Sequence, residues 1–436
     1  MKAKRMAMMV SALSLVTGAA WGAGTAPAGA VVGWWKFDDA ANPGKDSSEY
    51  GNHLTTLKNA SCVTKDAGYT NRGYYNDSGC LEVTSAGGSY SGTAKFVWDM
   101  TKGYTYLMRA RTGVSVELSF VEELFADDQL KNLVAMLNDN GGWHVLSYRY
   151  DPAKVTGSGS FCYSLFGDDP NAATAERASV DADDASTFLI APDIKIGGSV
   201  TAKSKTVSYK GYIDDAVVVA RTMSKSEIQT YMKTGEFNPF LRSDNDVSFN
   251  AADGWSCNDT EHVALGYGPH NLPGADFQVY GGRTIKATSA HAGTTFGGHS
   301  LSIGRTSPLA DLSTGTQVSS ADGNFVQQAS VTIPDLRLNR GKITASAGTA
   351  LATTKLTVNA AEENPYEINV ASGTYAVTGA ASGDGWLKKT GAGTLDLTGL
   401  TGAAKVVVTE GKVLAGPNVT VTYEEDQGAV PVLMAE

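Results

Sequence analysis

The residues best suited to molecular recognition are gathered in the stretch GYTNRGYYND (68–77). Sugars stack their C–H faces on aromatic rings and exchange hydrogen bonds with amide and guanidinium groups. We therefore predict a carbohydrate-binding loop here. The alternative is chance, because the chain has 18 tyrosines and some will share a loop. The predicted contact residues are Tyr69, Asn71, Arg72, Tyr74, Tyr75 and Asn76.

Catalytic chemistry finds little support in the sequence. A glycosidase needs two or more carboxylates on one face of a strand, and the nearest candidate here is Glu117, with Glu122 and Glu123 beyond it. Their spacing does not place the three in register on one face. None of the six histidines is flanked by a nucleophile elbow or by metal-ligand spacing. We predict that the protein is not an enzyme, that His53 caps a glycine loop, and that His144 lies on a sheet face.

The four cysteines are Cys62, Cys80, Cys162 and Cys257, and four cysteines allow three disulfide connectivities. Cys62 and Cys80 close a short loop in one loop-rich stretch, so we predict that these two pair. Buried thiols are the alternative for Cys162 and Cys257. No CxxC or Cys/His spacing indicates zinc.

The first 30 residues have the pattern of an export signal. Basic residues (Lys2, Lys4 and Arg5) precede an apolar run that begins at Met6, and small residues follow up to Ala30. The run is shorter than the roughly 20 residues of a membrane span, so cleavage is favoured over an anchor. We predict a secreted or cell-surface protein. Its formal net charge of -10 argues against nucleic acid and anionic membranes as partners.

The elements that must position these residues are mostly short strands. Strand patterns between turn signals fill residues 31–223 and predict a β-sandwich. One helix is predicted at 224–237, where Ser224 and Glu227 have capping-box spacing. Residues 121–137 fit a helix or a strand equally well. Residues 238–250 are rich in Pro, Asn and Asp and predict a linker.

Residues 251–436 have a different texture. Strand-like pieces recur between Gly, Asn or Ser turns, and no helix signal interrupts them. A repeat of about 20–25 residues with glycine at the corners predicts a right-handed parallel β-solenoid, in which each coil covers the apolar face of the one before it. A second antiparallel sandwich is the alternative.

Four stretches give the first domain, 31–237, a family resemblance. They are GWWKFDD (33–39), DSSEYGNH (46–53), GGWHVLSYRYD (141–151) and GYIDDAVVVARTMSKSEI (211–228). In this order they resemble the laminin G-like jellyroll of the concanavalin A-like lectin and glucanase superfamily. Two positions depart from the family pattern, with Glu49 in place of a glycine and Met223 in place of a leucine.

Residues 383–416 resemble the passenger-associated repeat of autotransporter proteins. The matching positions are Leu387, Lys389, Gly391, Gly393, Thr394, Leu395, Leu397, Gly399, Val408, Gly411 and Leu414. A phosphate-binding loop is excluded, because no Lys-Ser/Thr pair follows a glycine at the required spacing and no helix pattern follows. The resemblance implies that this glycine-rich stretch forms coils of the solenoid.

The jellyroll resemblance also implies a structural Ca²⁺ site. In that family calcium is held by carboxylates and carbonyls near the first and last strands, and oxygen ligands suit this ion. The matching residues here are Asp38, Asp46, Asn52, Asp214 and Asp215. The alternative is that these side chains cap turns and strand ends.

Together these observations predict an all-β protein with an N-terminal jellyroll β-sandwich and a C-terminal β-solenoid. The favoured function is an exported binding protein whose jellyroll recognises a carbohydrate or a surface glycoprotein, with the solenoid as a stalk. A structural protein of the cell envelope that self-associates is a second hypothesis. An accessory module of polysaccharide degradation is a third.

Overall fold

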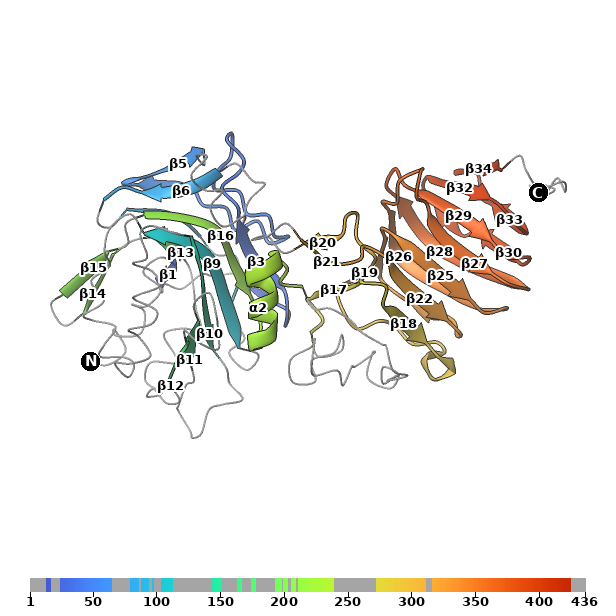
Figure 1. Ribbon diagram of the computed structural model, residues 1–436, viewed down its shortest axis with the longest axis horizontal. Coiled ribbons are helices and arrows are strands. Elements are labelled where there is room, and N and C mark those ends of the chain that lie inside the picture. The colour runs from blue at the N-terminus through green and yellow to red at the C-terminus, as the bar shows by residue number, and fades with distance from the viewer. Residues whose placement is uncertain are drawn as a thin grey trace. The chain divides into compact units, whose positions relative to one another are not determined.

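The computed structural model describes residues 13–16, 24–64, 79–85, 88–93, 96–97, 103–112, 143–150, 163–166, 174–177, 193–197, 199–202, 205–208, 211–238, 272–310 and 316–424 of the chain. The chain divides between Glu236 and Phe237 into two compact units, which are described separately (Figure 1). No helix in these described ranges is long and apolar enough to cross a membrane. The predicted helix-or-strand segment 121–137 lies outside the described residues, as does all but Asn238 of the predicted linker.

The first unit contains a large and a small antiparallel sheet. The large sheet has eight strands in the order β12 (Thr174–Arg177), β11 (Tyr163–Phe166), β10 (His144–Tyr150), β9 (Tyr104–Thr112), β16 (Gly211–Val219), β6 (Gly79–Val83) and β5 (Ala60–Thr64), with β3 (Val31–Trp35) paired to the later part of β16. The small sheet has the order β1 (Leu13–Val16), β13 (Asp193–Gly197), β7 (Ser89–Thr93) and β4 (Thr56–Lys58). Two further pairs are β14 (Ser199–Ala202) with β15 (Lys205–Ser208), and β2 (Gly24–Thr25) with β8 (Phe96–Val97).

The two sheets pack face to face over an apolar core. Leu81, Ala110 and Ile213 are fully buried and share the inner face of the large sheet. A Cβ added at Gly197 of the small sheet would lie 3.2 Å from the Val83 side chain, so the sheets are in contact at this point. The predicted sandwich is confirmed. Leu13–Val16 of the predicted export signal forms β1 at the edge of the small sheet, and removal of the signal stays a prediction.

The predicted helix is confirmed as α2 (Lys225–Thr234). The Ser224 side chain accepts a hydrogen bond from the backbone N–H of Glu227, and the Glu227 carboxylate accepts one from the Ser224 N–H. Gly235 ends the helix in the left-handed conformation with φ 71°, which glycine adopts without steric cost. The capping signals in the sequence therefore set both ends of this helix.

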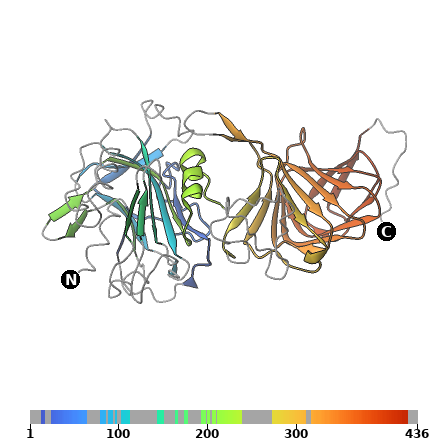
Figure 2. The same cartoon turned by 60° about the horizontal axis from the view of Figure 1, so that its bottom comes forward.

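The second unit is a parallel β-solenoid, and the alternative of a second antiparallel sandwich is wrong. One sheet runs β17 (Asp276–Val279), β19 (Ser300–Ile303), β24 (Asp335–Leu338), β26 (Ala350–Val358), β28 (Thr374–Ser382), β30 (Thr394–Leu397) and β33 (Lys412–Ala415), with β23 (Val331–Thr332) and β31 (Leu400–Thr401) beside it. The other runs β18 (Thr284–Ala287), β22 (Gly323–Gln327), β25 (Gly341–Ala345), β27 (Tyr366–Val370), β29 (Trp386–Thr390), β32 (Ala404–Val408) and β34 (Val419–Tyr423). Figure 2 shows the coils stacked along this unit.

Successive coils are held in register by side-chain contacts between neighbouring strands. Asp335 pairs with Lys355, 20 residues further on, which agrees with the expected repeat length. Inside the solenoid Leu301, Leu336 and Leu356 stack in neighbouring coils and are almost fully buried. An antiparallel hairpin, β20 (Leu309–Ala310) with β21 (Gln317–Ser319), interrupts the coils after β19, and a 3₁₀ turn, η8 (Ser289–His291), follows β18.

Candidate functional site

A row of polar side chains crosses the outer face of the large sheet, the face turned away from the small sheet. Strand register places Glu82 of β6 beside Tyr212 of β16, and Tyr212 beside Arg111 of β9. These three residues, called the polar row below, are half-buried. Their immediate neighbours along the strands, Ala110 and Ile213 among them, are fully buried on the inner face. The pleat of the sheet thus separates a polar outer surface from the apolar core.

The polar row is internally organised around the Tyr212 ring. The Tyr212 hydroxyl donates a 3.1 Å hydrogen bond to Glu82 Oε1, and the guanidinium carbon of Arg111 lies 5.8 Å from the ring centroid. Burial, followed by the hydrogen bond to Glu82, raises the pKa of Tyr212 above its ordinary value. The phenol therefore stays neutral at physiological pH. A cation and an anion flank an aromatic ring, an arrangement with both stacking surface and hydrogen-bonding groups.

Buried side chains lie beside the polar row on the same face of the sheet, since Cys80 is two residues before Glu82 in β6. Cys80 and Trp143 are buried together, and Val63 and Tyr212 pack against them as half-buried neighbours. Val63 lies opposite Cys80 in the pair of strands β5 and β6. This packing holds the base of the Tyr212 side chain, so the ring is supported by rigid strands rather than by a loop.

Helix α2 and the segment before it cover the other end of the same outer face (Figure 1). Thr105 donates to the Arg221 carbonyl and accepts from the Met223 N–H, both at 2.9 Å. Arg149 donates to the Met223 carbonyl at 2.7 Å, and Arg221 pairs with Glu227 at 2.8 Å. These buried bonds fix the helix against β9 and β10, and the polar row lies toward the other end of β9.

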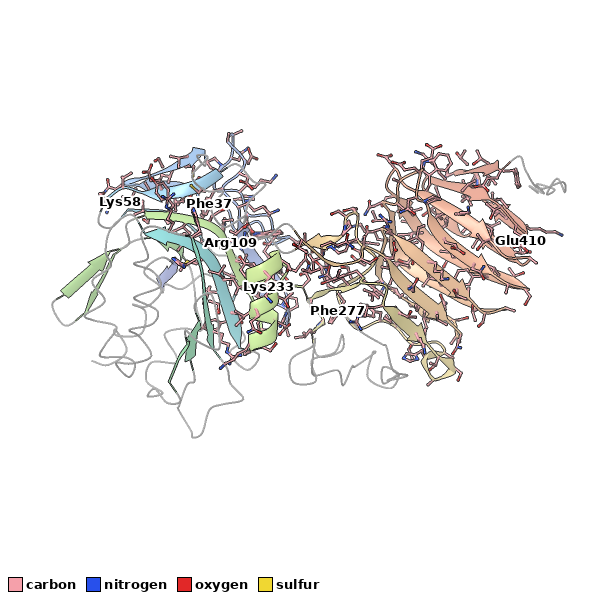
Figure 3. The ribbon with its side chains drawn as sticks, in the orientation of Figure 1. Phe37, Lys58, Arg109, Lys233, Phe277 and Glu410 are labelled. Carbon is pink, nitrogen blue, oxygen red and sulfur yellow. The ribbon has the colours of Figure 1, made fainter. Side chains whose placement is uncertain are left out.

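A buried ion pair connects the helix end of this face to the last strand. Arg109 of β9, labelled in Figure 3, bonds Asp215 at 2.9 Å. Asp215 has φ 45°, left-handed for a non-glycine residue, at a bulge in β16. It also accepts the Trp34 indole N–H at 3.2 Å, while its carbonyl accepts the Tyr231 hydroxyl. Such backbone strain persists only where surrounding contacts enforce it, as these do.

Asp46, the centre of the predicted calcium set, already has its oxygens occupied by protein donors. Oδ1 accepts the N–H groups of Trp34 and Ser48, both at 2.8 Å. Oδ2 accepts the Ser48 hydroxyl at 2.6 Å and the Asn52 N–H at 2.7 Å. The Asp46 N–H donates to His53 Nδ1 at 3.0 Å. The carboxylate organises the 46–53 loop, and calcium would have to displace these donors.

The other predicted calcium ligands also bond to protein groups. Asp38 accepts the Gly79 N–H at 2.8 Å, and Asp214 accepts the Asp215 N–H at 2.8 Å. The Asn52 amide donates to the Val32 carbonyl at 2.6 Å. Among the residues that the structure describes, no three Asp, Glu, His or Cys side chains form a metal-binding group. The arrangement fits turn and strand caps better than a calcium site, which stays a prediction.

The predicted disulfide between Cys62 and Cys80 does not form, and this prediction is wrong. The two residues lie on paired strands, but Cys62 is opposite Leu81 and Cys80 is opposite Val63. Directly opposed residues project from the same face, so the two thiols lie on opposite faces of the sheet. Burial raises the pKa of Cys62 to about 11.

The predicted tyrosine-rich loop, Tyr69, Asn71, Arg72, Tyr74, Tyr75 and Asn76, lies outside the described residues. The strands on either side of this loop are described: β5 ends at Thr64, which pairs with Gly79 at the start of β6. Glu117, Glu122, Glu123, Cys162 and Cys257 also fall outside. His144, predicted on a sheet face, begins β10 and is buried.

One cluster in the solenoid contains the residue types of a hydrolytic triad. Asp276 Oδ1 lies 2.8 Å from His299 Nδ1 and also accepts the Ser300 hydroxyl. In a Ser-His-Asp triad the imidazole stands between the hydroxyl and the carboxylate. Here the carboxylate occupies the middle position, so the histidine cannot take the serine proton, and this cluster does not have the triad geometry.

Comparison with known proteins adds one distant likeness. No protein-family profile matches the chain, and no curated protein matches it. Among solved structures, the chain is similar to the binding domain of Paraclostridial Mosquitocidal Protein 1, with a TM-score of 0.31 and 9% sequence identity. The match covers 51% of this chain and 56% of that chain. At these values the likeness carries no argument about function, and the site must be judged from its own geometry.

Proposed function

We propose that the chain is an exported, non-catalytic binding protein whose N-terminal sandwich recognises carbohydrate, with the solenoid as a spacer. The observation that carries the proposal is the polar row, in which a half-buried tyrosine stands between a carboxylate and a guanidinium. Sugars need an aromatic surface together with donors and acceptors that fix their hydroxyls. The row supplies all three on neighbouring strands.

The fold supports this role in two ways. Because the row lies on paired strands and Tyr212 packs against the buried side chains of Cys80 and Trp143, it is preorganised for binding. The solenoid has a continuous apolar interior and its coils repeat in register. A stack of this kind holds its ends at a fixed separation, which suits a stalk.

Glycan-array binding of the full chain tests the proposal, with Tyr212→Ala as the variant. We expect the wild type to bind and the variant to lose at least about tenfold in affinity, because truncating a central aromatic typically costs more than the 1.4 kcal/mol that corresponds to tenfold. Trp386→Ala is the matched control. Trp386 is also half-buried beside a cation, Lys405, but it lies on the solenoid.

The outcomes separate the hypotheses. Binding that Tyr212→Ala weakens and Trp386→Ala leaves unchanged supports recognition at the polar row. Equal loss in both variants, or no loss in either, refutes this site. No binding of any glycan by the wild type refutes the carbohydrate proposal, and cleavage of a bound polysaccharide refutes its non-catalytic part.

A further inference from the structure

The last described strand of the solenoid, β34, has inward residues that are partly uncovered. In β32, Val406 and Val408 point inward and are almost fully buried. Their partners in β34, Val421 and Tyr423, lie in the same inward column but are only half-buried. β34 lies at the end of the stack of coils in Figure 1, and among the described residues it pairs with β32 and with no strand on its other side.

The free edge of β34 also presents backbone hydrogen-bonding groups. The Glu424 N–H donates to the Val408 carbonyl of β32 at 3.2 Å. Alternate residues of a strand direct their backbone groups to opposite sides. Val421 and Tyr423, which lie three residues and one residue before Glu424, therefore direct their N–H and C=O groups away from β32. Such an edge is a template on which another strand can pair.

The sequence of β34, VTVTY (419–423), is nearly its own complement when two copies run antiparallel. With Val421 of one copy opposite Val421 of the other, Val419 opposes Tyr423 and Thr420 opposes Thr422. Inward apolar residues then meet inward apolar residues, and the two outward threonines meet each other, which are favourable cross-strand pairs. Like charges do not meet, because Glu424 comes opposite Asn418.

β34 also lacks the features that commonly protect an edge strand from pairing. Charged residues, prolines and bulges serve this purpose in natural sheets. β34 has neither a charged residue nor a proline, and its register with β32 is continuous. By contrast β4, an edge strand of the small sheet, contains the exposed Lys58, labelled in Figure 3. The difference indicates that the edge of β34 is used for pairing.

We propose that two copies of this chain associate end to end through β34, as an antiparallel pair with its two-fold axis at Val421. A two-fold interface brings the same surface of each copy together, so it requires a surface that complements itself, as this strand does. At the axis each Val421 N–H donates to the Val421 carbonyl of the other copy. The dimer stands whether or not the first unit binds carbohydrate.

Sedimentation velocity of the full chain at concentrations up to about 100 µM tests the proposal, and we expect a dimer. In Val421→Pro the ring replaces an N–H that faces the free edge, a position at which edge strands tolerate proline. Both copies lose a donor, so the dissociation constant should rise at least about tenfold. Val421→Lys should have the same effect, because it sets two ammonium groups opposite each other.

Val326→Lys is the matched control, because Val326 is a half-buried valine of β22, inside the stack of coils. This variant should dimerise like the wild type. Hydrogen exchange of the wild type gives a readout that needs no variant: the Val421 and Tyr423 amides should exchange faster on dilution, while the Val406 and Val408 amides should not change.

Three results would overturn the proposed dimer. The first is a wild type that stays monomeric and exchanges the Val421 and Tyr423 amides freely. The second is a monomer in which these two amides resist exchange at every concentration, which would assign the edge to another segment of the same chain. The third is a dimer that both Val421 variants retain, which would place the interface elsewhere.

Discussion

Lys389 is a buried lysine inside the solenoid, and its titration gives a prediction that can be worked from the structure. Its side chain is fully buried, in the column that also contains Ile368 and Val408. The ammonium donates to the carbonyls of Thr390 at 2.7 Å, Gly391 at 2.6 Å and Glu410 at 3.1 Å. Glu410, labelled in Figure 3, lies in the next coil, so the lysine ties two coils together.

Burial lowers the pKa of Lys389 from 10.5 to about 8, and the neighbouring Glu410 opposes this shift. The unfolded chain therefore binds more protons than the folded chain between pH 8 and 10.5, and stability must rise with pH across this window. At about 1.4 kcal/mol per pH unit, the gap between the two pKa values corresponds to about 3 kcal/mol. Below pH 8 the folded protein bears the full cost of the buried charge.

Lys389→Met, which has a similar length and no charge, should remove this pH dependence. The measurement is hydrogen exchange of the intact chain, from which the opening free energy of residues 385–412 is obtained between pH 7 and 10 for both proteins. We expect the wild-type value to rise by up to about 3 kcal/mol relative to the variant. Other groups titrate in this range, and the difference between the two proteins cancels their contribution.

Two results would refute the reasoning. Parallel pH curves would show that the proton on Lys389 has no effect on the stability of the coils. A wild-type curve that falls with pH relative to the variant would show that the three carbonyl bonds favour the charged form by more than burial disfavours it. Lys405→Met is the control, since its ammonium also donates to a carbonyl, that of Asp384, but at an exposed position.

Two further predictions concern the first unit. Asp215→Asn should lower the free energy of unfolding by about 3–5 kcal/mol because it leaves the Arg109 charge buried. The control is Asp322→Asn, at the exposed pair with Arg340, which should cost less than about 1 kcal/mol. Urea unfolding measures both losses, and equal losses would contradict the assigned role of the buried pair. A chelator should leave the melting temperature unchanged because protein donors already occupy Asp46, and a decrease that calcium reverses would establish the calcium site.

The solenoid was predictable because its signal is local and repeated. Each strand alternates inward and outward residues, and Leu387, Leu395 and Leu397 of the repeat stretch are all buried as that alternation requires. The same alternation places Lys389 inside, because it is two residues after Leu387. What the alternation did not indicate is how a charge is tolerated there, which the three carbonyls of the corner explain.

The candidate site was harder to predict because strand register, rather than a contiguous motif, assembles it. A loop dense in tyrosines attracts attention, whereas Tyr212, within GYIDDAVVV, has the composition of a core strand. A signal was nevertheless present: Glu82 follows the buried Leu81, Arg111 follows Ala110, and Tyr212 precedes Ile213, so each is the outward partner of an inward apolar residue. Sequence alone could place each of them on an outer face. Only the order of β6, β16 and β9 in the sheet, set by long-range pairing, brings the three together, and the binding proposal depends on that order.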